Sequence, residues 1–472
     1  MRNRRGLLQL EGLTERIVPA VSIRSVDGDL VIRGIANTDG AFQKLWVNVT
    51  ADNQVTIQDG GSAFGTGGIN RGVYAVTGDL IFNLSNRSDQ VTIDFKGAFT
   101  LDGSITATML NGNDTFTITN SGGSDSGIFG SLTVDGGNGT DTLSVTNTGT
   151  TSTMSIQGGL SFNGGAGVDV ANINHTGAVD SIEIGNGLTL TRVNTVNVGT
   201  TNDVAISGNA TINASADKLV TNSFNIGDTG RQVSIAGALA LTGGQGTDTV
   251  AIEAVTIVDV IPAEDEVLEI TINLDRGVNN STFTDIEFGV NGTDADFAYT
   301  GGTGVENVDF VGTNTVSGDS IFTFGNGSNS LEISNGTTFD ADVTVSGGKM
   351  DDTVTLNNAT VSGLLTLTMG NGTNTFTTGN AADISGGLTY TGGSQVDTVT
   401  LANGDGLAGD VSISVGAGAD NIDITGTTTV GVTSLTVDLG IDSALDTFDY
   451  NSILNSLITI LNQGSGDSVN AV

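Results

Sequence analysis

The side chains that could carry out chemistry in this chain are almost all carboxylates. Its 472 residues include 52 Asp and Glu against 15 Lys and Arg, one His and no Cys. Disulfide bonds, thiol catalysis and cysteine-based zinc sites are therefore excluded. The most regular carboxylates end glycine-rich turns of the form Gly-Gly-x-Gly-x-Asp, at Asp141, Asp169 and Asp248. In such a turn an Asp or Asn side chain can hydrogen-bond to the backbone and form a ladder with its counterparts in neighbouring repeats.

The position of these aspartates recurs at a nearly constant interval. Aligned positions recur roughly every 23 residues in the C-terminal third and roughly every 25–28 residues earlier in the chain. They are Asp89, Asp114, Asp141 and Asp169, then Glu306, Asn329, Asp352, Asn374, Asp397 and Asp420, with Asp446 following after a slightly longer interval. A period of this regularity indicates that each copy forms one unit of a stack.

The same turns resemble the calcium loop of RTX-type repeats, in which Ca²⁺ lies between stacked turns. That resemblance implies carboxylate and backbone carbonyl ligands for a hard cation that takes six or more oxygens. The residues it assigns to Ca²⁺ are Asp141, Asp169, Asp248, Asp352, Asp397 and Asp420. RTX repeats recur every nine residues, whereas this chain has one turn per roughly 22–28 residues. An Asp/Asn ladder without metal is the alternative.

Short strands on both sides of each turn predict the fold. Apolar residues alternate with Thr or Ser in segments such as 363–369 (GLLTLTM) and 409–415 (GDVSISV), which places one face inward and one outward. Two or three such strands per roughly 22–28 residues predict an all-β protein, a right-handed parallel β-helix (β-solenoid). The 70 Gly fit its corners, and only two Pro interrupt its backbone ladders.

Departures from the period divide the chain into four segments. Residues 1–20 form a basic leader or tail, and residues 21–252 form the N-terminal coils. Residues 253–300 lack the glycine turns and carry an acidic cluster at Glu264, Asp265, Glu266 and Glu269, which indicates an insertion or an enlarged coil. Residues 301–472 form the regular C-terminal coils, closed by an apolar end cap at 452–461 (SILNSLITIL).

The first twenty residues combine a basic start with an ordered set of leucines and charges: Leu8, Leu10, Glu11, Leu13, Glu15, Arg16, Pro19 and Ala20. In this order and spacing they resemble a leader found on large surface proteins of planctomycete bacteria. The family usually has Glu-Asp-Arg where this chain has Thr14-Glu15-Arg16. The resemblance covers only this segment, implies export to the cell surface or the extracellular space, and says nothing about activity.

Charge and composition exclude several classes of function. A net charge of −37 repels phosphate backbones, so nucleic acid is not an expected partner. No stretch is apolar enough to predict a transmembrane helix. Catalysis by a polysaccharide lyase needs a basic residue beside a calcium-bound acid, and only five cationic residues follow residue 96.

We expect His175 to be a solvated turn residue and Trp46 to pack in an N-terminal coil.

These observations favour an exported, non-enzymatic structural or adhesive protein of the cell surface. Its expected partners are a cell-surface polysaccharide or further copies of itself, joined end to end. A calcium-binding repeat protein is one alternative. A carbohydrate-active β-helix is another, in which residues 253–296 would form the wall of a cleft.

Overall fold

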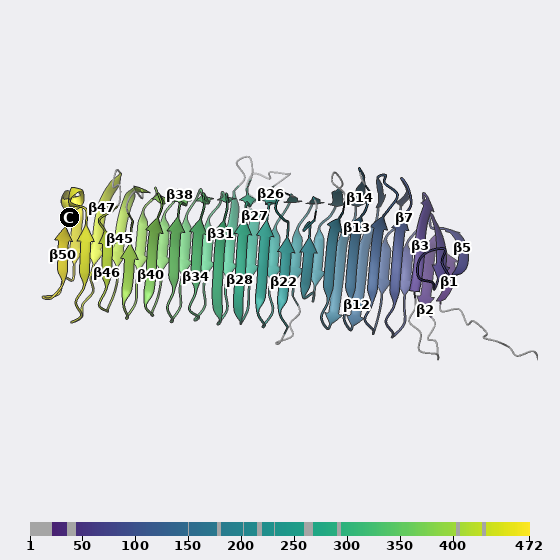
Figure 1. The fold of residues 1–472 in the computed structure, drawn as a ribbon, viewed down its shortest axis with the longest axis horizontal. Coiled ribbons are helices and arrows are strands. Elements are labelled where there is room, and N and C mark those ends of the chain that lie inside the picture. Colours follow the sequence, from purple (N-terminus) through teal and green to yellow (C-terminus); the bar gives the residue numbers. More distant parts are fainter. Residues whose placement is uncertain are drawn as a thin grey trace, which may run out of the picture.

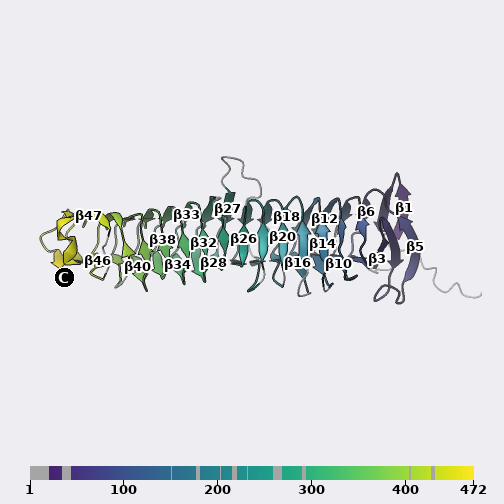
Figure 2. The ribbon, with the colours of Figure 1, turned by 90° about the horizontal axis from the view of Figure 1, so that it is seen from above.

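The chain folds into one long rod of stacked coils (Figures 1 and 2). The computed structural model describes residues 21–34, 44–149, 151–176, 181–201, 203–214, 220–230, 232–258, 268–289, 294–402, 406–426 and 431–472. Each coil adds a strand to a first and a second sheet, and most coils add one to a third. Pairing between successive coils is parallel along the rod, which confirms the predicted all-β, parallel β-solenoid.

The strands fall into three sheets, of which the third is confined to the coils between β8 and β44. The first sheet contains β1 (Val21–Val26), β2 (Asp29–Gly34), β6 (Leu80–Asn83), β9 (Ile105–Thr108), β12 (Ser131–Asn138), β15 (Gly159–Ala166), β18 (Leu188–Thr191), β21 (Ala210–Asn213), β24 (Leu239–Thr242), β27 (Leu268–Asn273), β30 (Ala295–Thr300), β33 (Ser320–Thr323), β36 (Val343–Ser346), β39 (Leu365–Thr368), β42 (Leu388–Thr391), β45 (Gly409–Ser414), β47 (Val432–Asp438) and β49 (Ile458–Leu461). The second sheet contains β3 (Lys44–Ala51), β4 (Gln54–Asp59), β5 (Ile69–Ala75), β7 (Gln90–Phe95), β10 (Thr115–Asn120), β13 (Thr142–Asn147), β16 (Val170–His175), β19 (Thr195–Val198), β22 (Asn222–Ile226), β25 (Asp248–Glu253), β28 (Val278–Thr284), β31 (Val305–Val311), β34 (Ser330–Ser334), β37 (Thr353–Asn357), β40 (Asn374–Gly379), β43 (Asp397–Thr400), β46 (Asn421–Ile424), β48 (Thr447–Tyr450) and β50 (Ser468–Ala471). The third contains β8 (Thr100–Leu101), β11 (Ser126–Ile128), β14 (Thr153–Ile156), β17 (Ser181–Ile184), β20 (Val204–Ile206), β23 (Val233–Ile235), β26 (Val255–Ile257), β29 (Glu287–Phe288), β32 (Thr315–Val316), β35 (Thr338–Phe339), β38 (Thr360–Val361), β41 (Asp383–Ile384) and β44 (Gly406–Leu407).

Alternating side chains build the core inside the coils. In β39, Leu365 and Leu367 are buried while the threonines between and after them face outward. Leu365 pairs with Val343 of the coil before and Leu388 of the coil after, so like residues form continuous apolar rows. Near the middle of the rod these rows are aromatic, and the rings of Phe283 and Phe310 stack with centroids 4.7 Å apart.

The coil length follows the period in the sequence. The 13 strands of the third sheet mark about 13 three-sided coils in the described part of the chain. Aligned residues on successive coils are 22 or 23 residues apart between Glu306 and Asp420, and 25 to 28 apart between Asp89 and Asp248. The predicted range therefore holds, and one coil, from Asp248 to Asn279, is lengthened to 31.

The two ends of the rod differ from its middle. At the N-terminal end β1 pairs with β2, and β4 with β3 and β5, in antiparallel fashion. At the C-terminal end a 3-10 helix, η1 (Ser452–Ser456), places Leu454 in the core and is followed by β49 and β50. This is the segment that the sequence suggests as an end cap.

The described strands of the predicted acidic insertion at 253–300 pair with the coils on either side. Strand β26 ends at Ile257 and β27 begins at Leu268, yet β27 pairs in parallel with β24 before it and with β30 after it. Glu264, Asp265 and Glu266 lie outside the described residues. The assignment of a separate segment here stays a prediction. Across the described residues, no helix has the length and apolar character needed to cross a membrane.

One expectation about a single residue is wrong. His175, expected in a solvated turn, is the last residue of β16 and only 1% exposed. It pairs in register with Asn147, another buried residue, at the corner where the second sheet leads into the third. Trp46 lies in the N-terminal coil as expected, half-buried on β3, with the Lys44 ammonium 5.0 Å from the centre of its ring.

Candidate functional site: the corner ladder

A column of acidic and amide side chains lines the inner corner between the first and second sheets. This corner ladder comprises Asp89, Asp114, Asp141, Asp169, Asn194, Asn222, Asp248, Asn279, Glu306, Asn329, Asp352, Asn374, Asp397, Asp420, Asp446 and Asp467. All but Asp467 are at most 3% exposed. So much buried polarity is tolerated only if the groups are hydrogen-bonded.

We call each residue of the corner ladder a rung. A hydrogen bond from one coil to the next joins each rung to its neighbour. In most rungs the backbone N–H of a ladder residue donates to the side-chain oxygen of the next one, as from Asp141 to Asp169 Oδ1 at 2.8 Å. Where the donor residue is Asn, its side-chain amide can make the bond, as from Asn374 Nδ2 to Asp397 Oδ1 at 2.9 Å. A hydrogen-bonded ladder of acidic and amide side chains is therefore present along the described rod.

A second hydrogen bond distinguishes the carboxylate side chains of the ladder from its amide side chains. We call the residue four positions before each ladder residue its corner residue. In five coils the N–H of the corner residue donates to the ladder carboxylate: Ser85 to Asp89 at 3.0 Å, Gly244 to Asp248 at 3.1 Å, Gly302 to Glu306 at 3.2 Å, Gly348 to Asp352 at 2.9 Å and Gly393 to Asp397 at 3.0 Å. In the aspartates, this N–H bonds to the oxygen Oδ2. In Glu306, the Gly302 N–H bonds to Oε1, which also accepts from Asn279 Nδ2.

Three of the five amide residues in the ladder reverse this contact. Asn279 Nδ2 donates to the carbonyl of Asp275 at 3.3 Å, Asn329 Nδ2 to that of Gly325 at 3.3 Å, and Asn374 Nδ2 to that of Gly370 at 3.2 Å. In these coils the corner peptide presents N–H to a carboxylate and C=O to an amide. This matching lets both kinds of side chain be buried at the same place in the coil.

The first glycine of the Gly-Gly turns is required by packing. A Cβ atom on Gly347 would lie 2.3 Å from Asp352 Oδ2, and one on Gly392 would lie 2.1 Å from Asp397 Oδ2. In the intervening amide coils the same position holds a buried large residue, Phe324 or Met369. Between Gly243 and Asp397, a coil with a glycine at this position and a carboxylate in the ladder therefore alternates with a coil that has a large residue and an amide. The structural repeat of this part of the rod is two coils.

Two tyrosines extend the ladder into the core. Tyr299 donates its hydroxyl to Glu306 Oε2 at 2.9 Å, and Tyr390 donates to Asp397 Oδ1 at 3.1 Å. Burial, with the neighbouring carboxylate, raises the pKa of both tyrosines, so they remain donors. Sequence reasoning missed this pair, although each Tyr stands seven residues before its acid at an inward position of a strand.

Among the described residues, four ladder aspartates have neither kind of corner contact at their second oxygen. The Oδ2 atoms of Asp114, Asp141, Asp169 and Asp420 are buried and have no hydrogen-bond partner in the described structure. Burial raises the pKa of these carboxyls, to about 7 for Asp114, about 6 for Asp169 and about 7 for Asp420. Neighbouring carboxylates add to the shift, as Asp89 and Asp141 do at Asp114.

All six predicted calcium ligands lie on the ladder, but in single file. Asp141 and Asp169 are neighbours, as are Asp397 and Asp420, whereas Asp248 and Asp352 each lie between two amides. Within the described residues, no three His, Asp or Glu side chains are close enough to hold a metal ion together. The calcium assignment stays a prediction.

Sequence analysis missed Asn194, Asn222, Asn279 and Asp467, because no regular Gly-Gly turn precedes them.

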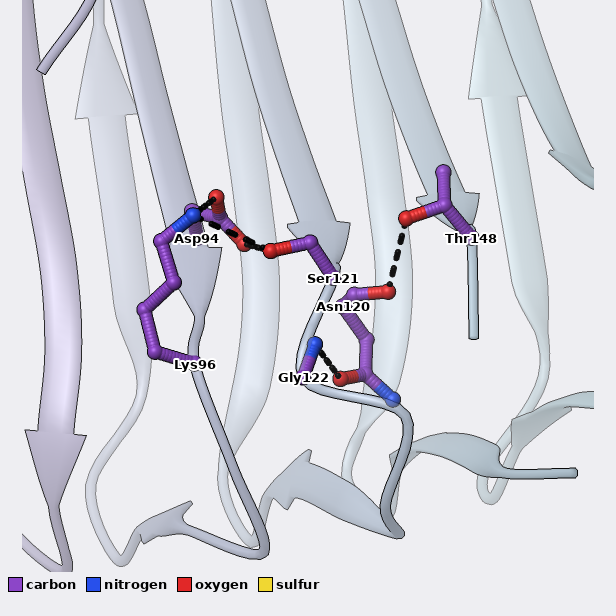
Figure 3. A network of polar contacts seen from close by, with 6 residues as sticks. All are labelled: Asp94, Lys96, Asn120, Ser121, Gly122 and Thr148. Atoms are coloured by element: carbon purple, nitrogen blue, oxygen red, sulfur yellow. Dashed lines mark hydrogen bonds and ion pairs between the residues drawn. The ribbon is translucent and has the colours of Figure 1, made fainter. Parts of the chain in front are cut away.

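Smaller networks stabilise the corner between the second and third sheets (Figure 3). The Asn120 side chain accepts from the Gly122 N–H at 3.3 Å, and its backbone carbonyl accepts from the Thr148 hydroxyl of the next coil at 3.1 Å. Outside them, Lys96 pairs with Asp94 and donates to Ser121 at 3.0 Å. These contacts again join one coil to its neighbour.

Comparison of the chain with protein-family models, with curated proteins and with solved structures gives no match.

Proposed function

We propose that this protein is an exported, non-enzymatic rod that acts as a structural or adhesive element of a bacterial cell surface. The corner ladder is the observation that supports this proposal most strongly. The most regularly placed carboxylates of the chain are buried one per coil and bonded between coils, so they serve cohesion and are not gathered in a cleft. The leader resemblance at Leu8–Ala20 supports the location.

Surface display is tested by protease treatment of intact cells. The full-length chain, tagged at its C-terminus, is expressed in a planctomycete host beside a variant in which Leu8, Leu10 and Leu13 are replaced by Gln. The wild-type protein should be degraded on intact cells while a cytoplasmic marker survives, and the leader variant should remain protected. Protection of the wild-type protein until the cells are lysed would contradict the proposal.

One surface feature supports an adhesive contact with a polysaccharide. A hollow of about 410 Å³ lies over β8, β11, β14 and β17, on the outer face of the third sheet. It contains the ring of Phe129, which is 47% exposed, together with Asp125, Gln157 and Glu183. An exposed ring among carboxylates and an amide suits the apolar face and hydroxyls of a sugar.

This contact is tested by the retention of the whole protein on immobilised neutral polysaccharides. Substitution F129A should abolish retention, whereas F99A, a change to a partly buried Phe that packs against the core, should leave it intact. Equal retention of wild-type protein and F129A would rule out this hollow as the contact.

A further inference from the structure

The outer face of the third sheet carries a second hollow, directly beyond the one that contains Phe129. This second hollow has a volume of about 370 Å³ and lies over β20, β23, β26 and β29. The first hollow ends at Glu183, which pairs with Ala205 of the next coil, and Ala205 follows Asp203 of the second hollow by two residues. The two hollows therefore adjoin along the rod, where β14, β20 and β26 follow one another in line (Figure 2).

One row of outward-facing residues joins the two hollows. It runs in register from Ser155 through Glu183, Ala205, Ser234 and Thr256 to Glu287. Ala205 and Ser234 lie where the hollows meet, and because both are small, no large side chain of this described row stands between one hollow and the other. The eight coils from β8 to β29 thus present one groove, about 34 Å long at the usual separation of strands.

Hydrogen bonds between coils hold the polar groups at the edge of this groove. Asp125 Oδ1 accepts the Thr153 N–H at 2.8 Å, and Asp203 Oδ1 accepts the Gln232 N–H at 2.9 Å. Gln232 Nε2 in turn donates to the Thr256 hydroxyl at 2.7 Å. Side chains fixed in this way lose little freedom when a ligand binds, which favours a ligand whose own polar groups lie at regular positions.

The charge of the groove disfavours an acidic ligand. None of the described residues that line the two hollows is Lys or Arg, and five of them are acids: Asp125, Glu183, Asp203, Asp285 and Glu287. Repulsion therefore opposes a glycan that carries uronic acids or sulfate groups. The carboxylates can accept hydrogen bonds from hydroxyl groups, and the exposed Phe129 ring offers an apolar surface to the face of a sugar. An uncharged sugar polymer fits both features.

We propose that the two hollows form one groove that binds a single unbranched, uncharged, β-1,4-linked polysaccharide chain parallel to the axis of the rod. This inference rests on the proposed contact with a polysaccharide at Phe129, and it adds the second hollow, the direction of the bound chain and its linkage. A β-1,4-linked chain is an extended ribbon in which one sugar residue is nearly as long as one coil is high, so successive sugars meet successive coils. A helical or branched glycan does not follow a straight groove.

The test is calorimetric titration of the whole protein with cellotriose and with cellohexaose. The hexaose is longer than the first hollow and reaches the second, so it should bind about tenfold more tightly than the triose, the gain from one added hydrogen bond to a carboxylate. Substitution E287A should remove this gain and leave the binding of the triose unchanged.

Substitution D383A is the matched control. Asp383 is an exposed acid of the same row, four coils beyond Glu287, so its removal makes the same change of charge outside the groove. It should alter the affinity for neither oligosaccharide. Equal affinity of the wild-type protein for the two oligosaccharides, or equal losses in E287A and D383A, would overturn the inference.

Substitution F129A separates this inference from the proposed function. If F129A abolishes binding of the triose while the hexaose gains nothing in the wild-type protein, the contact at Phe129 stands and the extended groove fails. If neither oligosaccharide binds but the protein is retained on another neutral polysaccharide, the linkage is wrong and the inference fails alone. Loss of all binding and all retention removes both.

Discussion

Asp397 and Asp420 lie on neighbouring rungs, and the backbone N–H of Asp397 donates to Asp420 Oδ1 at 2.7 Å. Their second oxygens nevertheless meet opposite surroundings. Asp397 Oδ2 accepts the Gly393 N–H, whereas Asp420 Oδ2 is buried without a partner. The aspartates occupy the same position in successive coils, but the turn before each has a different backbone conformation: Gly416, four residues before Asp420, has φ of +89°, whereas Gly393 is not among the residues of positive φ.

The glycine before each carboxylate rung should be irreplaceable on steric grounds alone. Gly392→Ala would place Cβ 2.1 Å from Asp397 Oδ2 and should destabilise the protein by about 1 to 3 kcal/mol, the usual cost of overpacking. Gly379→Ala, at the end of β40, is the control, because a Cβ there would meet nothing within 4 Å. Urea denaturation of both variants measures the difference, and equal stability would refute the packing argument.

The two core tyrosines should differ in their contribution to stability. Tyr299→Phe leaves Glu306 Oε2 without a partner and should cost about 1 to 3 kcal/mol, the usual penalty for a buried unsatisfied acceptor. Tyr390→Phe should cost less, because Asp397 Oδ1 keeps its bond from Asn374 Nδ2. Chemical denaturation at pH 7 compares them. A larger loss for the Tyr390 variant would contradict this description of the network.

Stability should fall as the pH rises toward 8, the reverse of ordinary acid denaturation. The pKa values of Asp114 and Asp420, about 7 in the folded rod, lie above the ordinary value of 3.8. A raised folded pKa contributes stability that is complete below about pH 4 and is lost as the pH rises through about 7. Thermal midpoints measured from pH 4.5 to 8.5 test the sign. A steady increase over that range would contradict it.

Calcium removal distinguishes the ladder from the RTX-like alternative. If hydrogen bonds alone complete the rungs, EDTA and millimolar Ca²⁺ should give the same thermal midpoint by circular dichroism at pH 7. A saturable rise with Ca²⁺ would instead support the calcium prediction for Asp141 and Asp169, since a ligand stabilises the state that it binds.

The sequence predicts the architecture well because the period and the alternation of Thr with Val, Ile and Leu are local signals. Aligned aspartates such as Asp352 and Asp397 also lie on one column, as their spacing indicates. The division into matched and unmatched corners could not be predicted. Asp141 and Asp248 end the same Gly-Gly-x-Gly-x-Asp motif, yet only the first has a corner residue of positive φ.

His175 illustrates the same limit. A polar neighbourhood in the sequence, Asn172 to Thr176, indicates a solvated turn. In the rod, stacking places residue 175 directly beside Asn147, where burial depends on the neighbouring coil. Such contacts join residues that are far apart in the sequence, so local patterns do not reveal them.

The measurement that most directly tests the matching of corner and rung is the pH dependence of stability in the Asn374→Asp variant. Asn374 lies in an amide corner between Asp352 and Asp397, so the new carboxyl should destabilise the rod by about 1 to 3 kcal/mol at pH 8.5. At pH 5, where it can be protonated and donate in place of the amide, stability should return nearly to that of the wild-type protein. Asn371→Asp adds the same charge on the exposed side of the turn and should have little effect at either pH. Equal losses at pH 5 and pH 8.5 for Asn374→Asp, or no loss at all, would contradict the account.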